Sequence, residues 1–332
     1  MKIAVVGVGA LGSLLGAYLG EIGDVVMVGH WREQVDTLQA NGLLMIRPDG
    51  TQTRFEPRIV DDPRQVDPVD VALVVVKSRQ TEVAAQTTAE LLKEDGLAIT
   101  LQNGLNNYEK LRDVLGEQRV TLGVTAEGAM MIDVAQVRHA GRGPTHFGRN
   151  SLLGDAQLVK LPQVVDLFSQ AGFEAYLVDD TDALVWGKLA VNAAINPLTA
   201  LLRVPNGFLV EHEALVNIMR RAAGEVADVA EALGIDLPFP DAAARAIEVA
   251  QATAGNRSSM LQDVTRGAPT EVEAICGAVA KIARDLGVYT PVNVRLCRLV
   301  SQIEGRKLPL LEQGDVAGLL DLLDLDSIKN RL

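Results

Sequence analysis

A lysine and two asparagines recur at intervals of four residues in an otherwise apolar stretch of the chain. Lys188, Asn192 and Asn196 lie among Leu, Ala, Val and Ile within residues 186–197. On a helix the three side chains fall on one stripe, and a helix that is apolar on its other faces is a buried one. Burying an unpaired polar group costs roughly 2–7 kcal/mol, so these groups need partners. A lysine ammonium held in such a place suits general acid catalysis.

Two explanations of this stripe stay open. The side chains either line a seam between domains and bond to backbone groups, or they form the polar wall of a cleft that faces a cofactor-binding domain.

A second group of polar residues follows at 256–263, N-R-S-S-M-L-Q-D, and at 270–273, T-E-V-E. Thr270 and Glu273 match the capping box T-x-x-E, which predicts a structural role for Glu273. Glu271 shares the apolar side of the predicted helix, which favours a carboxylate held in a site. The alternative is that Glu271 only interacts favourably with the positive end of the helix dipole.

The opening residues contain a nucleotide-binding pattern. Residues 2–6 form a short apolar strand by their β-branched composition, and residues 11–19 have helical spacing of apolar side chains. Between them lies G-x-G-x-x-G, whose glycines permit a tight turn, close approach of a pyrophosphate and close packing of helix on strand. The cofactor-binding residues predicted here are Gly7, Val8, Gly9, Ala10, Leu11 and Gly12.

The same segment also resembles a leader or membrane helix, because residues 3–20 carry no charge. Gly12, Gly16 and Gly20 even have the small-xxx-small spacing of packed membrane helices. The strand–turn–helix setting and a second strand at 25–28 favour the dinucleotide site.

The end of the second strand bears on cofactor choice. An NAD site usually has Asp or Glu there to bind the ribose 2′-hydroxyl, whereas this chain has V-G-H-W-R at 28–32. Arg32, with His30 nearby, suits a 2′-phosphate, so we expect NADP (NADPH) as the cofactor. The alternative is that Arg32 is a solvated arginine at a helix start.

The pattern along the chain predicts two domains. Strand-like runs alternate with helical stretches up to about residue 180, which is typical of a doubly wound, mostly parallel sheet. Residues 130–137 and 145–147 flank G-R-G-P and predict a hairpin added to that sheet. From residue 179 onward only helical periodicity is found. We therefore predict an α/β protein, with a Rossmann-type dinucleotide domain at 1–180 and an all-α substrate and catalytic domain at 181–332.

Ligands of open α/β sheets bind beyond the carboxyl ends of the strands. Lys77 and Asn103 follow the predicted strands at 71–76 and 97–101. Lys77 is expected to contact a cofactor phosphate and Asn103 the cofactor or substrate, although each is also explained as an ordinary polar loop residue.

The composition excludes several classes of function. The net charge of −12 argues against nonspecific binding to nucleic acid or to anionic membranes. Two cysteines provide no disulfide framework, and the four histidines have no zinc-ligand spacing, so no metal site is expected. A protein of the reducing cytoplasm fits these features.

Together these motifs resemble the 2-dehydropantoate 2-reductase (ketopantoate reductase) family. The resemblance rests on G-x-G-A-L-G at 7–12, V-K-S at 76–78, Q-N-G at 102–104, W-G-K-L-A-V-N-A-A-I-N-P-L-T-A at 186–200, N-R-S-S-M-L-Q-D at 256–263 and T-E at 270–271. It spans both predicted domains in order.

The resemblance implies NADPH-dependent reduction of 2-dehydropantoate to (R)-pantoate, on the route to pantothenate and coenzyme A. It implies Lys188 as the catalytic acid together with Glu271, and Asn103 and Glu271 near the cofactor as well. A homodimer is expected only at the level of the family. The implied substrate-binding residues are Asn103, Asn192, Asn196, Asn256 and Ser259.

Two other functions remain open on the sequence. The chain is alternatively a related reductase of another 2-oxo acid, because one scaffold serves several substrates. It is otherwise a non-catalytic NADP-sensing regulatory protein, a class that would need neither Lys188 nor Glu271.

Overall fold

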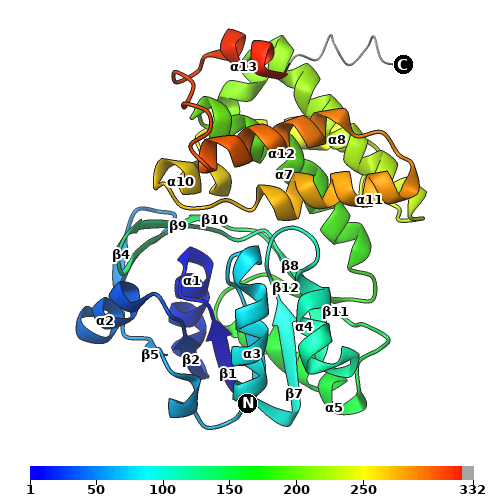
Figure 1. Cartoon of the computed structure of the whole chain (residues 1–332). Coiled ribbons are helices and arrows are strands. Elements are labelled where there is room, and N and C mark those ends of the chain that lie inside the picture. The colour runs from blue at the N-terminus through cyan, green and yellow to red at the C-terminus, as the bar shows by residue number, and fades with distance from the viewer. Residues whose placement is uncertain (324–332) are drawn as a thin grey trace. The chain divides into compact units, whose positions relative to one another are not determined.

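The computed structural model describes residues 1–323, which separate into two compact units. The first unit contains residues 1–102 and 106–181, and the second begins at Asp182. The short segment Asn103–Leu105 groups with the second unit, although it directly follows a strand of the first. Figure 1 labels the elements of both units.

The first unit is built on an eight-stranded sheet. All neighbouring strands are parallel except β8 and β11, which are antiparallel. The helices between the strands are α1 (Ala10–Gly20), α2 (Arg32–Asn41), α3 (Thr81–Leu91), α4 (Asn107–Leu115), α5 (Asp155–Leu158) and α6 (Lys160–Gln170). The spatial order is β12 (Ala175–Val178), β11 (Thr145–Gly148), β8 (Val120–Thr125), β7 (Leu92–Thr100), β6 (Val69–Val74), β1 (Lys2–Val6), β2 (Asp24–Val28) and β5 (Arg58–Val60).

Both faces of this sheet are covered by helices. Successive strand residues point to opposite faces: Ile3 and Val5 join the cluster under α1 and α6, whereas Ala4 and Val6 join the cluster under α3 and α4. Strands buried on both faces are near-continuous runs of apolar residues, which is why the sequence of β1, β2 and β6 hardly alternates. The predicted doubly wound α/β fold is confirmed.

A smaller four-stranded sheet corrects one prediction. Its spatial order is β4 (Gln52–Phe55), β3 (Leu43–Ile46), β10 (Gln136–Gly141) and β9 (Gly128–Asp133). The expected hairpin between 130–137 and 145–147 is wrong, because β9 pairs with β10 and Thr145–Gly148 pairs with β8.

The hairpin turn lies at Val134–Ala135, and it is determined by a contact with a residue far away in the sequence. The backbone N–H of Ala135 donates to the buried side chain of Gln34 at 2.8 Å, and Ala135 has a φ of 54°. The G-R-G-P segment instead leads from the small sheet to the large one. A Cβ on Gly143 would lie 2.7 Å from that of Ala126, so glycine there serves close passage of two chain segments rather than a hairpin.

The second unit consists of helices over its described length (Figure 1). None of the helices within residues 1–323 has the length and hydrophobicity that crossing a membrane requires. The elements are α7 (Asp182–Leu202), α8 (Glu213–Ala232), α9 (Ala242–Ala252), α10 (Ser259–Thr265), a π-helical turn (Glu273–Gly277), α11 (Ala278–Leu286), α12 (Pro291–Glu304) and α13 (Val316–Leu323).

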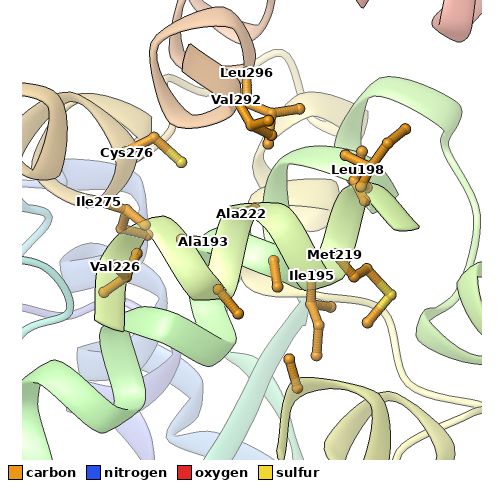
Figure 2. Packing of buried hydrophobic residues seen from close by; sticks show 14 of the residues in the cluster. Ala193, Ile195, Leu198, Met219, Ala222, Val226, Ile275, Cys276, Val292 and Leu296 are labelled. Atoms are coloured by element: carbon orange, nitrogen blue, oxygen red, sulfur yellow. The ribbon is translucent and has the colours of Figure 1, made fainter. Parts of the chain in front are cut away.

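Helix α7 runs through the core of this unit. Ala193, Ile195 and Leu198 of α7 belong to one buried cluster with side chains of α8, the π-helical turn and α12, and Figure 2 shows this packing. The apolar faces of α7 are therefore occupied, and its polar stripe is the part left for other partners.

A buried carboxylate anchors α12 on α8. Glu225 of α8 accepts the backbone N–H groups of Val292 and Asn293, both at 2.8 Å, and the side-chain amide of Asn293 at 2.9 Å. These are N–H groups of the first turn of α12, which lack partners within the helix itself. Burial raises the pKa of Glu225, and these hydrogen bonds act in the opposite direction.

The anchor predicts a stability effect. Glu225→Gln leaves one oxygen for three donors and places an NH₂ group against a backbone N–H. Its free energy of unfolding at pH 8 should fall by about 1–3 kcal/mol, measured by denaturant titration. Glu231→Gln, at an exposed site on the same helix, is the control and should change little. Equal values for both variants would contradict the anchor.

Candidate active site

The turn between β1 and α1 has the geometry of a phosphate-binding turn. Gly7 has a φ of +122°, which side chains rarely adopt, and a Cβ on Gly12 would collide with the carbonyl oxygen of Gly7. At Gly9 an added Cβ would meet no atom within 4 Å, so the backbone there borders open space. Gly9 is also the N-cap of α1 and provides no side-chain cap. The helix N-terminus is thus available to an anion.

The end of β2 has no carboxylate. The strand ends at Val28, and α2 begins at Arg32 with Trp31 as its N-cap. The Arg32 side chain is 81% exposed and pairs with Asp36 at 3.5 Å, which is a surface ion pair of small energy. The Arg32 side chain is therefore held only by a weak surface contact and is available to a ligand.

The ends of β6 and β7 are tied together by a residue that the sequence reasoning passed over. Gln102 donates through its side-chain amide to the carbonyl of Val76 at 2.9 Å and to the hydroxyl of Thr81 at 2.8 Å. Lys77 directly follows Val76 in the sequence, and Asn103 directly follows Gln102. Gln102 is part of the Q-N-G motif, but its bonding partner lies 26 residues away in the sequence and is set by tertiary structure.

In the helical unit, α7 carries the predicted stripe. Lys188 and Asn192 are partly buried, and Asn196 is 6% exposed. Within residues 1–323 the side chains of Asn192 and Asn196 have no hydrogen-bond partner. Neither side chain is among the fully buried polar atoms without a partner, so both amides remain accessible, and no bond to a seam of backbone groups is found among the described residues.

The environment changes the acidity of the lysine. Desolvation lowers the pKa of Lys188 from 10.5 to about 8, and the negative charge of Glu271 acts in the opposite direction. An amine with this pKa is protonated at neutral pH yet gives up its proton far more readily than an exposed lysine. That is the requirement for a general acid working near pH 7.

Glu271 is buried, at 7% exposure, and Asn103 donates to its carboxylate at 3.4 Å. The loop that carries Asn103 is fixed by Gly104 and Leu105. Gly104 has a φ of +80°, and a Cβ there would lie 2.5 Å from the carbonyl oxygen of Ala274, which accepts the N–H of Leu105 at 2.9 Å. Only glycine fits so close an approach, and Ala274 belongs to the π-helical turn, a feature frequent at functional sites.

The predicted capping box is wrong in its partners. The backbone N–H of Thr270 donates to Glu304, not to Glu273, and the Thr270 hydroxyl accepts from Val272. Glu273 is exposed and accepts from the hydroxyl of Ser301 at 3.0 Å. The pattern T-x-x-E was present, but a carboxylate from α12 satisfies the donor instead. The predicted difference between a buried Glu271 and an outward Glu273 is confirmed.

The start of α10 brings a serine close to α7. Ser258 is the N-cap of α10, and its hydroxyl lies 2.7 Å from that of Thr199 on α7. Ser259 follows as the first helical residue and is partly buried, whereas Asn256 is exposed in the preceding loop. Sequence reasoning missed Thr199 and Ser258, because only their pairing across 59 residues distinguishes them from other hydroxyls.

The site residues thus fall into two sets. Gly7–Gly12, Arg32 and Lys77 belong to the first unit, and a helix N-terminus with nearby cations suits a dinucleotide. The second unit contains a cation of lowered pKa, a buried carboxylate and amide and hydroxyl groups, which together suit proton donation to a small polar substrate. This second set consists of Asn103, Lys188, Asn192, Asn196, Asn256, Ser259 and Glu271.

Comparisons with known proteins identify the family of the chain. The model of ketopantoate reductase PanE/ApbA matches residues 3–151, and the model of its C-terminal domain matches residues 180–304. The chain belongs to the ketopantoate reductase family. Its relatives include the 2-dehydropantoate 2-reductase of Halobacterium salinarum, 38% identical over 302 residues, which covers 90% of this chain and 98% of that one. That of Vibrio cholerae is 32% identical, with 92% and 98% covered.

Solved structures show the same fold. A ketopantoate reductase of the PanE/ApbA family from Ralstonia eutropha has a TM-score of 0.83 at 30% identity, covering 92% of this chain and 99% of that one. D-mandelate dehydrogenase, solved with NADH and anilino(oxo)acetate, has a TM-score of 0.85 at 27% identity, with 92% and 99% covered. Members of the ketopantoate reductase family are oxidoreductases, and this chain is a nicotinamide-dinucleotide-dependent reductase.

The two glutamates predict opposite outcomes. Glu271→Gln should lower kcat/KM at least about tenfold, since charge-assisted hydrogen bonds contribute roughly 1.5–3 kcal/mol. Its melting temperature should stay similar or rise, because a buried charge is removed. Glu273→Gln keeps an acceptor for Ser301 and should change neither quantity. Steady-state kinetics and thermal unfolding of both variants test this, and loss of activity in Glu273→Gln alone would reverse the assignment.

Proposed function

We propose that this protein reduces 2-dehydropantoate to (R)-pantoate with NADPH. The observation that carries the proposal is Lys188, whose pKa is lowered to about 8. It shares one unit with the buried Glu271 and with the unpaired amides of Asn192 and Asn196. Relatives named 2-dehydropantoate 2-reductase, at 38% and 37% identity over about nine-tenths of this chain, support the choice of substrate.

In this proposal residues 1–180 form the dinucleotide domain and residues 181–332 the catalytic domain. The turn at Gly7–Gly12 holds the pyrophosphate, and the open space beside Gly9 fits it. Lys77 and Asn103 complete the cofactor contacts, with Glu271 near the nicotinamide end. The bound dihydronicotinamide supplies the hydride that converts the ketone to an alcohol. A biosynthetic enzyme of this kind would work in the cytoplasm, and a homodimer fits the family.

The residues of the chain supply the proton and the orientation. As negative charge develops on the ketone oxygen, the Lys188 ammonium stabilises it and transfers a proton from Nζ to that oxygen. The neutral amine then regains a proton from solvent. Glu271 keeps Lys188 charged before the transfer, because a nearby opposite charge favours the ammonium form.

Substrate recognition uses the unpaired polar groups. Asn192 and Asn196 bind the hydroxyl of the substrate, Ser259 binds its carboxylate, and Asn256 adds a further contact. A site built to hydrogen-bond a hydroxyl rejects analogues that lack it, because its buried groups are then left unpaired.

NADPH is proposed over NADH from the end of β2. Val28 is followed by Gly29, His30 and Trp31, so no carboxylate is placed to bind a ribose 2′-hydroxyl. Arg32 at the start of α2 offers a guanidinium and a helix N-terminus to a 2′-phosphate.

A second candidate is a reductase of another 2-oxo acid. D-mandelate dehydrogenase, which has the same fold at a TM-score of 0.85, was solved with NADH and anilino(oxo)acetate, so this scaffold also serves other substrates. A sensor without turnover is opposed by Lys188 and Glu271, which such a protein would not need. Oxidation of NADPH by purified protein with 2-dehydropantoate and a panel of 2-oxo acids separates the three functions. No turnover with any member would refute the proposal.

The lysine predicts a pH dependence. Neutral Lys188 cannot donate a proton, so kcat/KM for reduction should be constant below a pH of about 8 and should fall above it. Lys188→Ala should lower kcat by about 10²–10⁴ and remove this limb of the profile. Lys281→Ala, at an exposed site on α11, should behave as the wild type. A folded Lys188→Ala protein with normal turnover would contradict the role.

The arginine predicts cofactor preference. The wild type should use NADPH with higher kcat/KM than NADH, and Arg32→Ala should reduce that ratio at least about tenfold, because a charge-assisted phosphate contact is lost. Arg284→Ala, on the exposed end of α11, is the matched control and should keep the ratio. Equal efficiency of the wild type with both cofactors would overturn the assignment of NADP.

A further inference from the structure

The hydroxyl of Thr199 lies at the centre of a short chain of hydrogen bonds. It is 3.0 Å from the carbonyl oxygens of both Ile195 and Asn196, and 2.7 Å from the hydroxyl of Ser258. The Ser258 hydroxyl also accepts the backbone N–H of Leu261 at 3.0 Å. Thr199 is completely buried and Ser258 is 8% exposed, so neither hydroxyl exchanges these partners for bulk water.

The hydrogens available to this chain are few. Carbonyl oxygens only accept, so the single hydrogen of the Thr199 hydroxyl is directed at Ile195, at Asn196 or at Ser258. Either hydroxyl can donate in the bond between Thr199 and Ser258, and the Ser258 oxygen also accepts from Leu261. With either donor the two hydroxyls join α10 to α7 through a buried bond, and bonds arranged in such a series strengthen one another.

The two ends of the chain carry substrate-binding residues. Asn196 supplies one of the accepting carbonyls, and its side chain is nine-tenths buried without a hydrogen-bond partner among residues 1–323. Ser259 directly follows Ser258 and opens α10. Labelled neighbours of Asn196 on α7, Ile195 and Leu198, point into the apolar core in Figure 2, so α7 itself is immobilised.

The loop before α10 has a second attachment to the segment that follows α7. Asn206 donates its backbone N–H to the carbonyl of Asn256 at 3.0 Å and its side-chain amide to Thr253 at 2.9 Å. A Cβ on Gly207 would lie 2.6 Å from that of Ala254. These contacts fix the beginning of the loop, and the Thr199–Ser258 bond fixes its end, where Ser259 lies.

We propose that Thr199 is a positioning residue, which through Ser258 sets the distance and orientation between Asn196 and Ser259 and so the selectivity of the site for a hydroxylated 2-oxo acid. The inference rests on the proposed function, in which Asn196 binds the hydroxyl of the substrate and Ser259 its carboxylate. Thr199 itself does not touch the substrate.

The test compares two substrates and four proteins. 2-Dehydropantoate and 3,3-dimethyl-2-oxobutanoate differ only in the terminal hydroxyl. Thr199→Val removes the hydroxyl of residue 199 with little change of shape, and Thr199→Ser retains it. Thr88→Val is the matched control, because Thr88 is also completely buried and its hydroxyl also bonds a carbonyl four residues earlier, but in α3 of the first unit.

In Thr199→Val, kcat/KM for 2-dehydropantoate should fall about ten- to a hundredfold, the range expected from misplaced binding groups. The fall should be smaller for the analogue, so that selectivity for the hydroxyl declines, while the KM for NADPH stays unchanged. Thr199→Ser should restore the wild-type values, and Thr88→Val should keep both kinetics and selectivity. A merely structural role would lower activity toward both substrates equally, and that result would overturn the proposal.

A double-mutant cycle with Ser258→Ala tests the bond itself. If the two hydroxyls act through each other, Thr199→Val/Ser258→Ala should be no worse than the more damaging single variant; multiplied effects would overturn the inference. If Thr199→Val does not fold, Thr199→Ser and Ser258→Ala test the proposal instead. Ser258→Ala should lose selectivity for the hydroxylated substrate, and Thr199→Ser should keep it. A wild-type protein that reduces neither substrate refutes the proposed function, whereas normal selectivity in both Thr199→Val and Ser258→Ala refutes only the positioning role.

Discussion

A lysine ammonium held among apolar residues is the constraint around which the helical unit is organised. Desolvation lowers the pKa of Lys188 to about 8, and the charge of Glu271 prevents a larger fall. A nearby opposite charge favours the ammonium form, so the protonation state of Lys188 depends on Glu271. The elements that carry them are correspondingly rigid: α7 is packed on its apolar faces (Figure 2), and Glu271 precedes a π-helical turn whose Ala274 is contacted by Gly104.

In both units a glycine allows two backbone segments to pack closely. At Gly12 and at Gly104 the absent Cβ allows one backbone to approach another more closely than any other residue permits. The first contact shapes the turn beside Gly9 for a phosphate, and the second holds Asn103 against Glu271. The short loop Asn103–Leu105 that follows β7 thereby belongs to the helical unit, where it contacts Glu271 and Ala274.

Features encoded by local pattern were predictable from sequence. The strands of the large sheet, the helical second unit and the burial of Glu271 against the exposure of Glu273 follow from periodicity, because one buried face imposes a regular spacing of apolar residues. Features decided by long-range contacts were not. The turn at Ala135 depends on Gln34, the donor of Thr270 is satisfied by Glu304, and the pairing of Thr199 with Ser258 spans 59 residues. In each case several residues matched the local pattern, and tertiary structure selected among them.

The polar side chains of α7 and its neighbours differ in how far the protein itself occupies them. Thr199, Ser258 and Glu225 are buried and fully engaged, whereas the amides of Asn192 and Asn196 have no partner within residues 1–323. Neither amide is among the fully buried polar atoms without a partner, so both remain accessible and cost little stability. In the proposed function these accessible amides are the groups that a hydroxylated substrate bonds, whereas the engaged side chains hold the helices that carry them.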